Sequence, residues 1–435
     1  MAKSDQQTRW INAWCLYDWA NSAFVTTIMA SFLPIFFRKV SAGPLDQQGH
    51  ALATSLWGYI SAISMLLVAT LSLILGPVAD YGSAKKRFLG VFAGLGILFS
   101  SLLALTGYGD WLLTAMFFIL AEIGFAVGEV FYDAMLPHVA GPEKMHEVST
   151  RGYALGYMGG GILLALNILM LWILPKTVLP SHPEPFPLLG MKLSFLSVGI
   201  WWAVFSIPLF LFVPEMGGEG HSLQQTHYVS LALKRLKNTF SELKKYREAF
   251  LFILAFWFYN DGIGTIIKMA TAYGDEIGIG TLDLVCALLL TQLIGIPFSF
   301  LFGKIAQWIG AKKAILVGLL GYFCITLGGF FMAKAWHFWL LAGCVGVVQG
   351  GTQALSRSLF GSMIPKSKSA EFFAFYNISG KFAGILGPAV FGFIGQLTGT
   401  SRVGILSLIF FFLVGGILLC LVDVEKGKRI AEEPE

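Results

Sequence analysis

Long apolar runs recur along the whole chain and are separated by short polar connections. The clearest run lies between Ala51 and Ala79, where no residue carries a charge. A helix needs roughly 20 consecutive apolar residues to cross the hydrocarbon core of a bilayer. The runs predict twelve membrane-spanning helices, at residues 12–37, 53–78, 88–107, 111–132, 152–174, 192–213, 250–271, 282–303, 314–333, 337–360, 373–396 and 402–423.

These runs predict an all-α membrane protein. No run alternates apolar and polar positions as a membrane-spanning strand would, and backbone groups in lipid must be paired within their own segment. Hydrophobic residues make up 56% of the chain, charged residues make up 13%, and the mean hydropathy is +0.72. This composition excludes a water-soluble fold and leaves no room for a large catalytic domain. The five cysteines lie within apolar runs without a Cys-x-x-Cys spacing, so we interpret them as packing residues.

The placement of positive charge predicts the orientation of the spans. The net charge is +5, and most Lys and Arg residues lie in the termini and in the connections that follow even-numbered spans. Such residues are retained on the cytoplasmic side of a membrane. We therefore expect both termini in the cytoplasm. We also expect this modest excess of positive charge to direct topology and not to bind nucleic acid.

One polar connection is long enough to divide the chain. Residues 214–249 separate a first half of six spans, 1–213, from a second half of six spans and a cytoplasmic tail, 250–435. Apolar residues of the connection recur at helical spacing, which predicts an amphipathic helix on the cytoplasmic membrane surface. The alternative is a solvated linker helix without a regulatory role. The apolar positions are Leu233, Leu236, Phe240 and Leu243.

The two halves repeat each other. The segment Gly76–Lys86 after the second span aligns without gaps with Gly303–Lys313 after the eighth, and Asp18 of the first span aligns with Asp261 of the seventh. Each half has an even number of spans, so the repeats share one orientation about an axis along the membrane normal, as in major facilitator transporters. Glycines of the fifth and eleventh spans also align, and we interpret them as sites of close helix packing. The aligned pairs are Gly152 with Gly380, Gly156 with Gly384, and Gly159 with Gly387.

The repeated segment resembles the loop motif that major facilitator transporters carry between their second and third helices. In that superfamily its acidic residue and cations help to hold the cytoplasmic side closed. The second copy here has Gln307 in place of the acid. The alternative for Lys85 to Arg87 of the first copy is that these cations only direct topology. The residues that the resemblance assigns to gating are Asp80, Lys85, Lys86 and Arg87 in the first copy, and Lys312 and Lys313 in the second.

Polar residues interrupt the first and seventh spans at positions that the repeat relates. A charge at the centre of a span costs at least roughly 2.5–3.5 kcal/mol, so each one requires a partner or a function. Asp18 and Asn21 lie in the first span, and Asn260 and Asp261 lie in the seventh. Lys268 follows Asp261 by two helical turns, and it either neutralises Asp261 or points outward to the membrane interface.

Three carboxylates of the fourth span, Glu122, Glu129 and Asp133, fall within about 20° of one line on a helix. Such a stripe cannot face lipid, so we expect it to face the central cavity and to couple protons. The alternative is a ladder of ion pairs with Arg151, at the start of the fifth span, and we favour that alternative for Asp133.

The tenth span carries Gln349, Gln353 and Arg357 at successive steps of four residues. The repeat sets Arg357 opposite Glu129, so the two can form a pair that breaks when the halves rock apart. Arg357 is equally suited to bind a substrate carboxylate with its planar guanidinium. Gln349 lies near the middle of the span and offers both a donor and an acceptor to a substrate.

Several blocks of the chain resemble the vacuole-effluxer-like family of the major facilitator superfamily, which includes the autophagy-related vacuolar amino-acid exporters. They are Tyr17–Phe24, Arg151–Tyr157, Tyr259–Gly262, Gln349–Ser358 and Phe372–Pro388. The resemblance implies export of neutral amino acids such as leucine and tyrosine. The short loops are typical of the bacterial branch, which implies a multi-pass protein of the inner (cytoplasmic) membrane.

We therefore expect a secondary active transporter that works by alternating access, not an enzyme. Its partners would be a small-molecule substrate, protons or another coupling ion, and the lipid bilayer, and we expect a monomer without cofactor or metal. No nucleotide-binding motif or metal-binding pair of histidines is present. The alternatives are a drug or lipid exporter on the same fold and, more remotely, an intramembrane aspartyl protease, because Tyr17-Asp18 resembles half of such a site.

Overall fold

A computed structural model describes residues 2–48, 52–81, 85–180, 182–215, 245–364 and 369–432. Within those residues, twelve helices are long and apolar enough to cross a membrane, and each one overlaps a predicted span. The prediction of an all-α membrane protein with twelve spans is therefore confirmed. The predicted amphipathic helix of the central connection and the side chain of Asp80 lie outside the part that is described.

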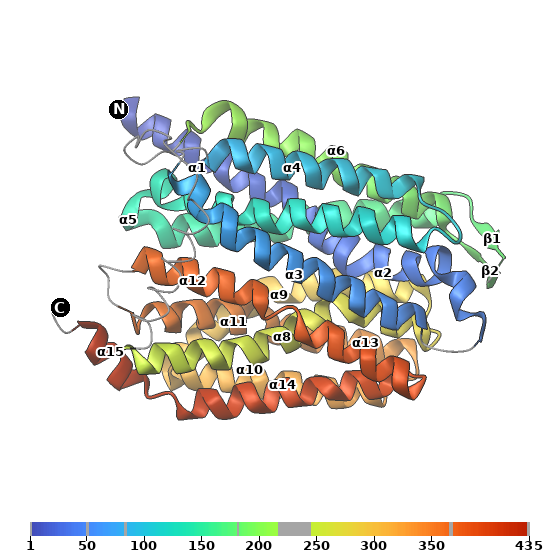
Figure 1. The fold of residues 1–435 in the computed structure, drawn as a ribbon. Helices are drawn as coiled ribbons and strands as arrows, with labels where there is room; N and C mark the ends of the chain where they lie inside the picture. Colours follow the sequence, from blue (N-terminus) through green and yellow to red (C-terminus); the bar gives the residue numbers. More distant parts are fainter. Residues whose placement is uncertain are drawn as a thin grey trace. The chain divides into compact units, whose positions relative to one another are not determined.

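The chain packs as two compact units, which Figure 1 draws along the sequence from blue to red. Unit 1 contains Met1–Gly49 and Thr70–Val229, and unit 2 contains His50–Ala69 and Ser230–Glu435. The helix of the second span, α3 (Leu52–Tyr81), therefore contributes its first part to unit 2 and its remainder to unit 1. The boundaries predicted from the sequence, which place that whole span in the first half, stay a prediction.

Unit 1 holds the first span and spans three to six, together with a short hairpin. Its elements are α1 (Ala2–Ala23), η1 (Phe24–Phe32), α2 (Leu33–Phe36), η2 (Phe37–Ser41), η3 (Gly43–Gln48), α4 (Lys85–Leu102), η4 (Leu103–Leu105), α5 (Trp111–Ile173), β1 (Thr177–Leu179), β2 (His182–Phe186) and α6 (Leu188–Phe212). The two strands are antiparallel and pair Thr177 with Phe186.

Unit 2 holds the first part of α3 and the last six spans. Its other elements are α8 (Arg247–Glu276), α9 (Thr281–Ile309), α10 (Ala311–Phe330), α11 (Ala335–Gly361), α12 (Ser369–Phe382), α13 (Leu386–Thr398), α14 (Ser401–Leu421) and α15 (Val424–Glu432). The last of these was not predicted, and it follows α14 after a short connection.

Helix α5 contains both the fourth and the fifth span. Its backbone is helical throughout, yet Trp14 of α1 stacks on Tyr132 with ring centroids 4.2 Å apart and also lies 3.0 Å from where a Cβ on Gly152 would stand. Twenty residues of straight helix would separate those positions by about 30 Å. The helix therefore folds back between Tyr132 and Gly152, which belong to the fourth and fifth spans.

Two spans depart from the regular helices that their apolar runs predict. The first span widens into π-helical turns at η1 and η2, and Leu33 N–H donates to Ile28 O, five residues back. The eleventh span is broken between α12 and α13, which Figure 1 draws as two successive coils. Pro388 lies in the first turn of α13, where its missing N–H costs no intrahelical hydrogen bond.

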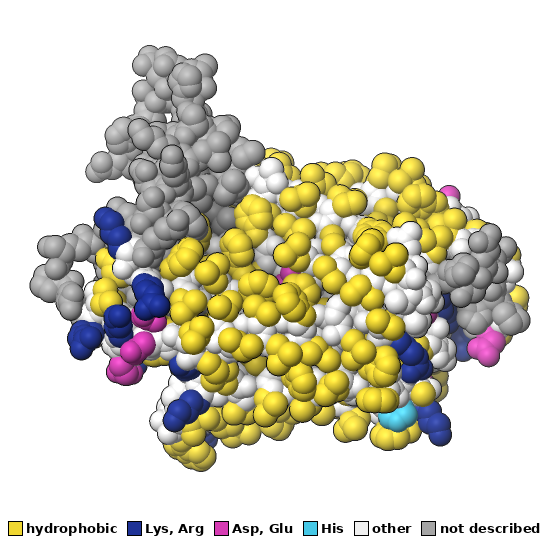
Figure 2. Space-filling view, turned by 60° about the horizontal axis from the view of Figure 1, so that its bottom comes forward, with side chains coloured by type: hydrophobic (Ala, Val, Ile, Leu, Met, Phe, Trp, Pro, Cys, Tyr) yellow, Lys and Arg dark blue, Asp and Glu magenta, His cyan; other side chains and the backbone are white. Residues whose placement is uncertain are grey.

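The outer surface is largely apolar, as expected for a protein that is surrounded by lipid. Figure 2 shows a broad band of hydrophobic side chains, with Lys and Arg gathered beyond its edges. Trp308, at the end of α9, is 81% exposed, and Trp172 near the end of α5 is 72% exposed. Tryptophan is enriched at the two interfaces of a membrane, so these positions fit the ends of the spans.

Candidate functional site

A buried carboxylate in unit 2, that of Asp261 on α8, is the centre of the candidate site. Only 2% of this residue is exposed, and the backbone N–H of Gly387 donates to both of its carboxylate oxygens at 2.9 Å each. Gly387 belongs to the first turn of α13, where backbone N–H groups have no acceptor within the helix. The break in the eleventh span therefore presents free donors to a carboxylate buried in the seventh.

Gly387 is required at this position because α13 approaches α8 closely. A Cβ built on Gly387 would lie 2.7 Å from Asp261 Oδ1 and would collide with Thr265 Oγ1. The Thr265 hydroxyl donates to Asp261 O at 2.7 Å, which fixes its side chain against the same turn. Any larger residue at position 387 would push the first turn of α13 away from the carboxylate.

Lys268 lies on the same helix, two turns beyond Asp261. Only 6% of this residue is exposed, so its side chain is directed into the protein and not outward to the interface. Seven residues of helix place its Cα about 10 Å from that of Asp261. The carbonyl of Lys268 accepts from Trp57 Nε1 of α3 at 2.9 Å. Asn260, the neighbour of Asp261, is half-buried.

The repeat-related acid of unit 1, Asp18, has a different environment. It is half-buried on α1, and a Cβ built on Gly152 of α5 would lie 2.5 Å from its Oδ2. The fifth span is unbroken at this point, so its N–H groups stay within the helix. Asn21 is 2% exposed on the same helix, and no partner for its Nδ2 is found among the described residues.

The contacts also correct the repeat alignment of the fifth and eleventh spans. A Cβ on Gly156 would meet Ser22 Oγ and Asp18 O, and a Cβ on Gly387 would meet Thr265 Oγ1 and Asp261 O. The sequence alignment pairs Gly156 with Gly384, three residues earlier than Gly387. Residues 383–385 form the turn between α12 and α13, and this turn accounts for the shift.

Residues of the fourth and tenth spans are placed on single helices of their own units. Glu122 is 2% exposed on α5, and Glu129 and Asp133 are half-buried there. On α11, Gln349 and Arg357 are half-buried, and Gln353 is exposed. Arg151, the predicted partner of the α5 carboxylates, is exposed. Because Glu129 and Arg357 belong to different units, their predicted pairing stays a prediction.

Sequence reasoning missed a second polar contact of α8. The hydroxyls of Tyr259 and Ser356 lie 2.7 Å apart, and both residues are buried. Ser356 also donates to Thr352 O at 2.7 Å. Tyr259 is two residues before Asp261, and Ser356 is one residue before Arg357. This closeness in the sequence to predicted site residues was the signal that could have identified the pair. The pair connects α8 to α11 inside unit 2.

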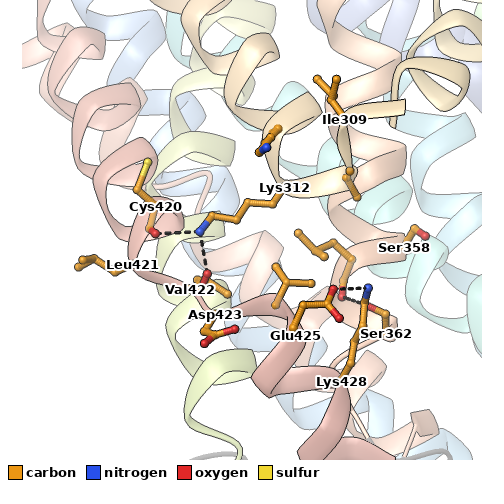
Figure 3. A pocket seen from close by; sticks show the side chains of 15 residues that line it. Ile309, Lys312, Ser358, Ser362, Cys420, Leu421, Val422, Asp423, Glu425 and Lys428 are labelled. Carbon is orange, nitrogen blue, oxygen red and sulfur yellow. Dashed lines mark hydrogen bonds and ion pairs between the residues drawn. The ribbon is translucent and has the colours of Figure 1, made fainter. Parts of the chain in front are cut away.

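Two lysines of the repeated loop motif bind the ends of helices within their own units. Lys86 Nζ donates to Val213 O at 2.6 Å, beyond the end of α6. Lys312 Nζ donates to Cys420 O and Val422 O at 2.8 Å each, at the end of α14 (Figure 3). Lys85 Nζ donates to Ala134 O at 3.4 Å, whereas Arg87 and Lys313 are exposed.

Lys312 also borders the cavity that Figure 3 shows. This cavity of about 610 Å³ opens between the start of α10 and the ends of α11 and α14, and α15 covers one side. Glu425 and Lys428 of α15 form an ion pair at 3.0 Å on its wall. Its charged groups therefore largely neutralise one another.

Three comparisons relate the chain to known proteins. The family described as "Vacuole effluxer Atg22 like" matches residues 47–432. An uncharacterised MFS-type transporter of Bacillus subtilis, YxiO, is 38% identical over 98% of this chain and 97% of that protein. Autophagy-related protein 22 of Coccidioides immitis is 24% identical over 97% of this chain and 87% of that protein.

Solved structures of transporters share the fold. A bacterial homologue of the human lysosomal transporter Spinster has a TM-score of 0.67 at 14% identity, covering 99% of both chains. A D-xylose–proton symporter has a TM-score of 0.68 at 14% identity, covering 97% of this chain and 98% of that chain. At this level of identity the similarity concerns the fold alone.

Proposed function

Because the chain belongs to the Atg22-like family of vacuole effluxers and is a transporter of the major facilitator type, we propose that it exports neutral amino acids by proton-coupled alternating access. In a bacterium it would do so across the inner membrane, as a monomer. No enzymatic activity enters this proposal, since the relatives are transporters.

The observation that carries the proposal is the buried carboxylate of Asp261. An ionisable group inside a membrane span costs free energy, so such a group marks a candidate functional site. Asp261 is held by the amide of a broken helix and lies two turns from the buried Lys268, which supports a role in which its charge changes during the cycle. A proton that binds there would neutralise the acid and release the amide of Gly387.

The remaining predicted residues have proposed roles in coupling, substrate binding and gating. Coupling carboxylates besides Asp261 are Asp18, Glu122 and Glu129, of which Glu122 is the most buried. Polar side chains would bind the substrate, and Arg357 would either bind its carboxylate or pair with Glu129. The substrate candidates are Asn21, Asn260, Gln349 and Gln353, and the gating candidates are Asp80, Lys85, Lys86, Arg87, Arg151, Lys312 and Lys313.

Proteoliposome uptake under an imposed pH gradient tests the proposal. Purified protein should accumulate radiolabelled leucine or tyrosine when the gradient is imposed, and Glu122→Gln and Asp261→Asn should each remove that accumulation. Exchange of internal for external substrate without a gradient should persist in at least one of the two variants, because exchange needs no net proton movement. Transport that ignores both the gradient and Glu122→Gln would contradict proton coupling.

A panel of solutes separates amino-acid export from the alternative on the same fold. Related amino acids should raise the melting temperature of the purified protein as a group. A shift caused by amphiphilic drugs or lipids alone would favour the drug or lipid exporter and would contradict the proposed substrate class.

A further inference from the structure

The broken eleventh span connects the buried acid to the second span. The short helix α13 contacts Asp261 at its first turn through Gly387. Farther along, it packs on the first part of α3, where a Cβ on Gly58 would lie 2.6 Å from Pro388 O and 3.2 Å from Gly392 Cα. One short rigid element therefore touches both the carboxylate and α3.

The contact between α13 and α3 is tight and specific. A Cβ on Gly392 would lie 2.7 Å from Ser55 O, so both backbones approach without side chains between them. Tyr59 OH donates to Gln396 Oε1 at 2.7 Å, which fixes the register of the two helices. Small residues at facing positions allow such close approach in a membrane. A displacement of α13 would therefore move the first part of α3 with it.

Helix α3 also connects the two units by its own backbone. Residues 52–69 belong to unit 2, and the same helix continues without interruption to Tyr81 in unit 1. We propose that Asp261 controls a joint at residues 383–385, and that α13 passes the state of this joint to α3. When Asp261 is ionised, its carboxylate holds the first turn of α13. When it is neutral, that turn is released, and α3 moves with α13.

The electrostatics around Asp261 are simple enough for one group to control the joint. No residue of α13, or of α3 between residues 52 and 69, carries a charge. On α8 the charged residues besides Asp261 are Arg247, Glu248, Lys268, Asp275 and Glu276, and Lys268 is the nearest of them along the helix. The other helices packed on α8 also carry charged side chains. Among the described side chains they include Lys381 on α12, Arg402 on α14, Arg357 on α11, Asp283 and Lys304 on α9, and Glu425, Lys428 and Arg429 on α15.

The role of the joint in transport rests on the proposed proton coupling, but the joint itself can be measured without transport. A fluorine label on a cysteine at Leu386, which is 59% exposed in the first turn of α13, would report the release. A second label at Ile63, 50% exposed on α3, would report its transmission. The native cysteines other than the buried Cys15 would be replaced first.

We expect the ¹⁹F resonance at position 386 to shift with pH, and the resonance at position 63 to shift with the same midpoint. Asp261→Asn should abolish both shifts, and Asp18→Asn should leave them, because Asp18 faces an unbroken helix. Gly387→Ala should abolish them by displacing α13, whereas Gly264→Ala, with open space around its Cβ position, should not.

Two results would overturn the proposal: no shift in the parent protein between pH 4 and 10, or a shift that survives in Asp261→Asn. A shift at position 386 without one at position 63 would overturn the transmission to α3. If the resonances behave as expected while leucine uptake ignores the pH gradient, the joint stands and the proposed coupling fails. Circular dichroism and size-exclusion chromatography would verify that each variant is folded.

Discussion

Lys312 donates to the carbonyl oxygen of Val422 at 2.8 Å and so binds the end of the last span in unit 2. In unit 1, Lys86 donates in the same way to Val213, beyond the end of the sixth span. The last carbonyls of a helix have no N–H partner within it, and a cation there also complements the helix dipole. Lys86 and Lys312 therefore stabilise the ends of helices within their own units. This role is separate from their proposed role in gating.

Replacing Lys312 by Met should lower the free energy of unfolding. A hydrogen bond from a charged group to an otherwise unpaired carbonyl contributes about 1–2 kcal/mol when partly exposed. The melting temperature of purified Lys312→Met should fall, and that of Lys313→Met should not, because Lys313 is exposed. Equal melting temperatures would contradict the capping role. Loss of uptake at an unchanged melting temperature would instead support gating.

Gly58→Ala should separate α3 from α13. Its Cβ would stand 2.6 Å from the carbonyl oxygen of Pro388, and backbone atoms cannot yield as a flexible side chain can. Overpacking of this kind costs typically 1–3 kcal/mol. The buried Ser55 lies in the same contact, so a cysteine placed there should react faster with a membrane-impermeant thiol reagent in the Gly58→Ala background. Gly94→Ala is the control, since nothing lies within 4 Å of its Cβ position.

The twelve spans were predictable because hydropathy measures what lipid requires of a segment. The equivalence of Asp18 and Asp261 was also available, because the internal repeat aligns them without structural information. Hydropathy does not report whether a span is continuous, however. The turn at residues 383–385 lies within a run that is long and apolar enough to be one helix.

The sequence contains a signal for that break, although the repeat favours an interpretation of the same glycines as sites of close helix packing. Gly384, Gly387 and Pro388 interrupt the eleventh span, and glycine or proline interruptions of an apolar segment are typical of broken helices at transport sites. The interpretation as close packing holds in the fifth span, where Gly156 packs against Ser22. In the eleventh span the same residue type frees an amide for Asp261, and only tertiary contact distinguishes the two outcomes.

Trp14 and Tyr132 should each stabilise unit 1 through a hydrogen bond of its own. Trp14 Nε1 donates to Tyr132 O at 3.1 Å, Tyr132 OH donates to Trp14 O at 3.0 Å, and the two rings stack. Each hydrogen bond contributes about 1 kcal/mol, and buried polar atoms that lose their partner cost more. Trp14→Phe and Tyr132→Phe should each destabilise unit 1, and the two losses should add, because each variant removes a different hydrogen bond to a backbone carbonyl that the other leaves in place. A single variant that unfolds at the same temperature as the parent protein would contradict the hydrogen bond that it removes.

Asp261 and Lys268 should be coupled over a longer distance. Their Cα atoms lie about 10 Å apart along α8, and opposite charges at about that separation attract by about 1–2 kcal/mol when the effective dielectric constant is about 20. Lys268→Met should therefore destabilise the protein by more in the parent background than in the Asp261→Asn background. The thermal unfolding of the four proteins in this cycle provides the measurement.

The matched control combines Lys268→Met with Asp18→Asn, the repeat-related acid of the other unit, for which the two losses should add. Additive losses for Asp261→Asn and Lys268→Met would mean that Lys268 does not neutralise Asp261. Coupling of the expected size would instead indicate that Lys268 neutralises Asp261 during the transport cycle. Its charge would stabilise the ionised carboxylate of Asp261, so the pH dependence of uptake should differ between Lys268→Met and the parent protein.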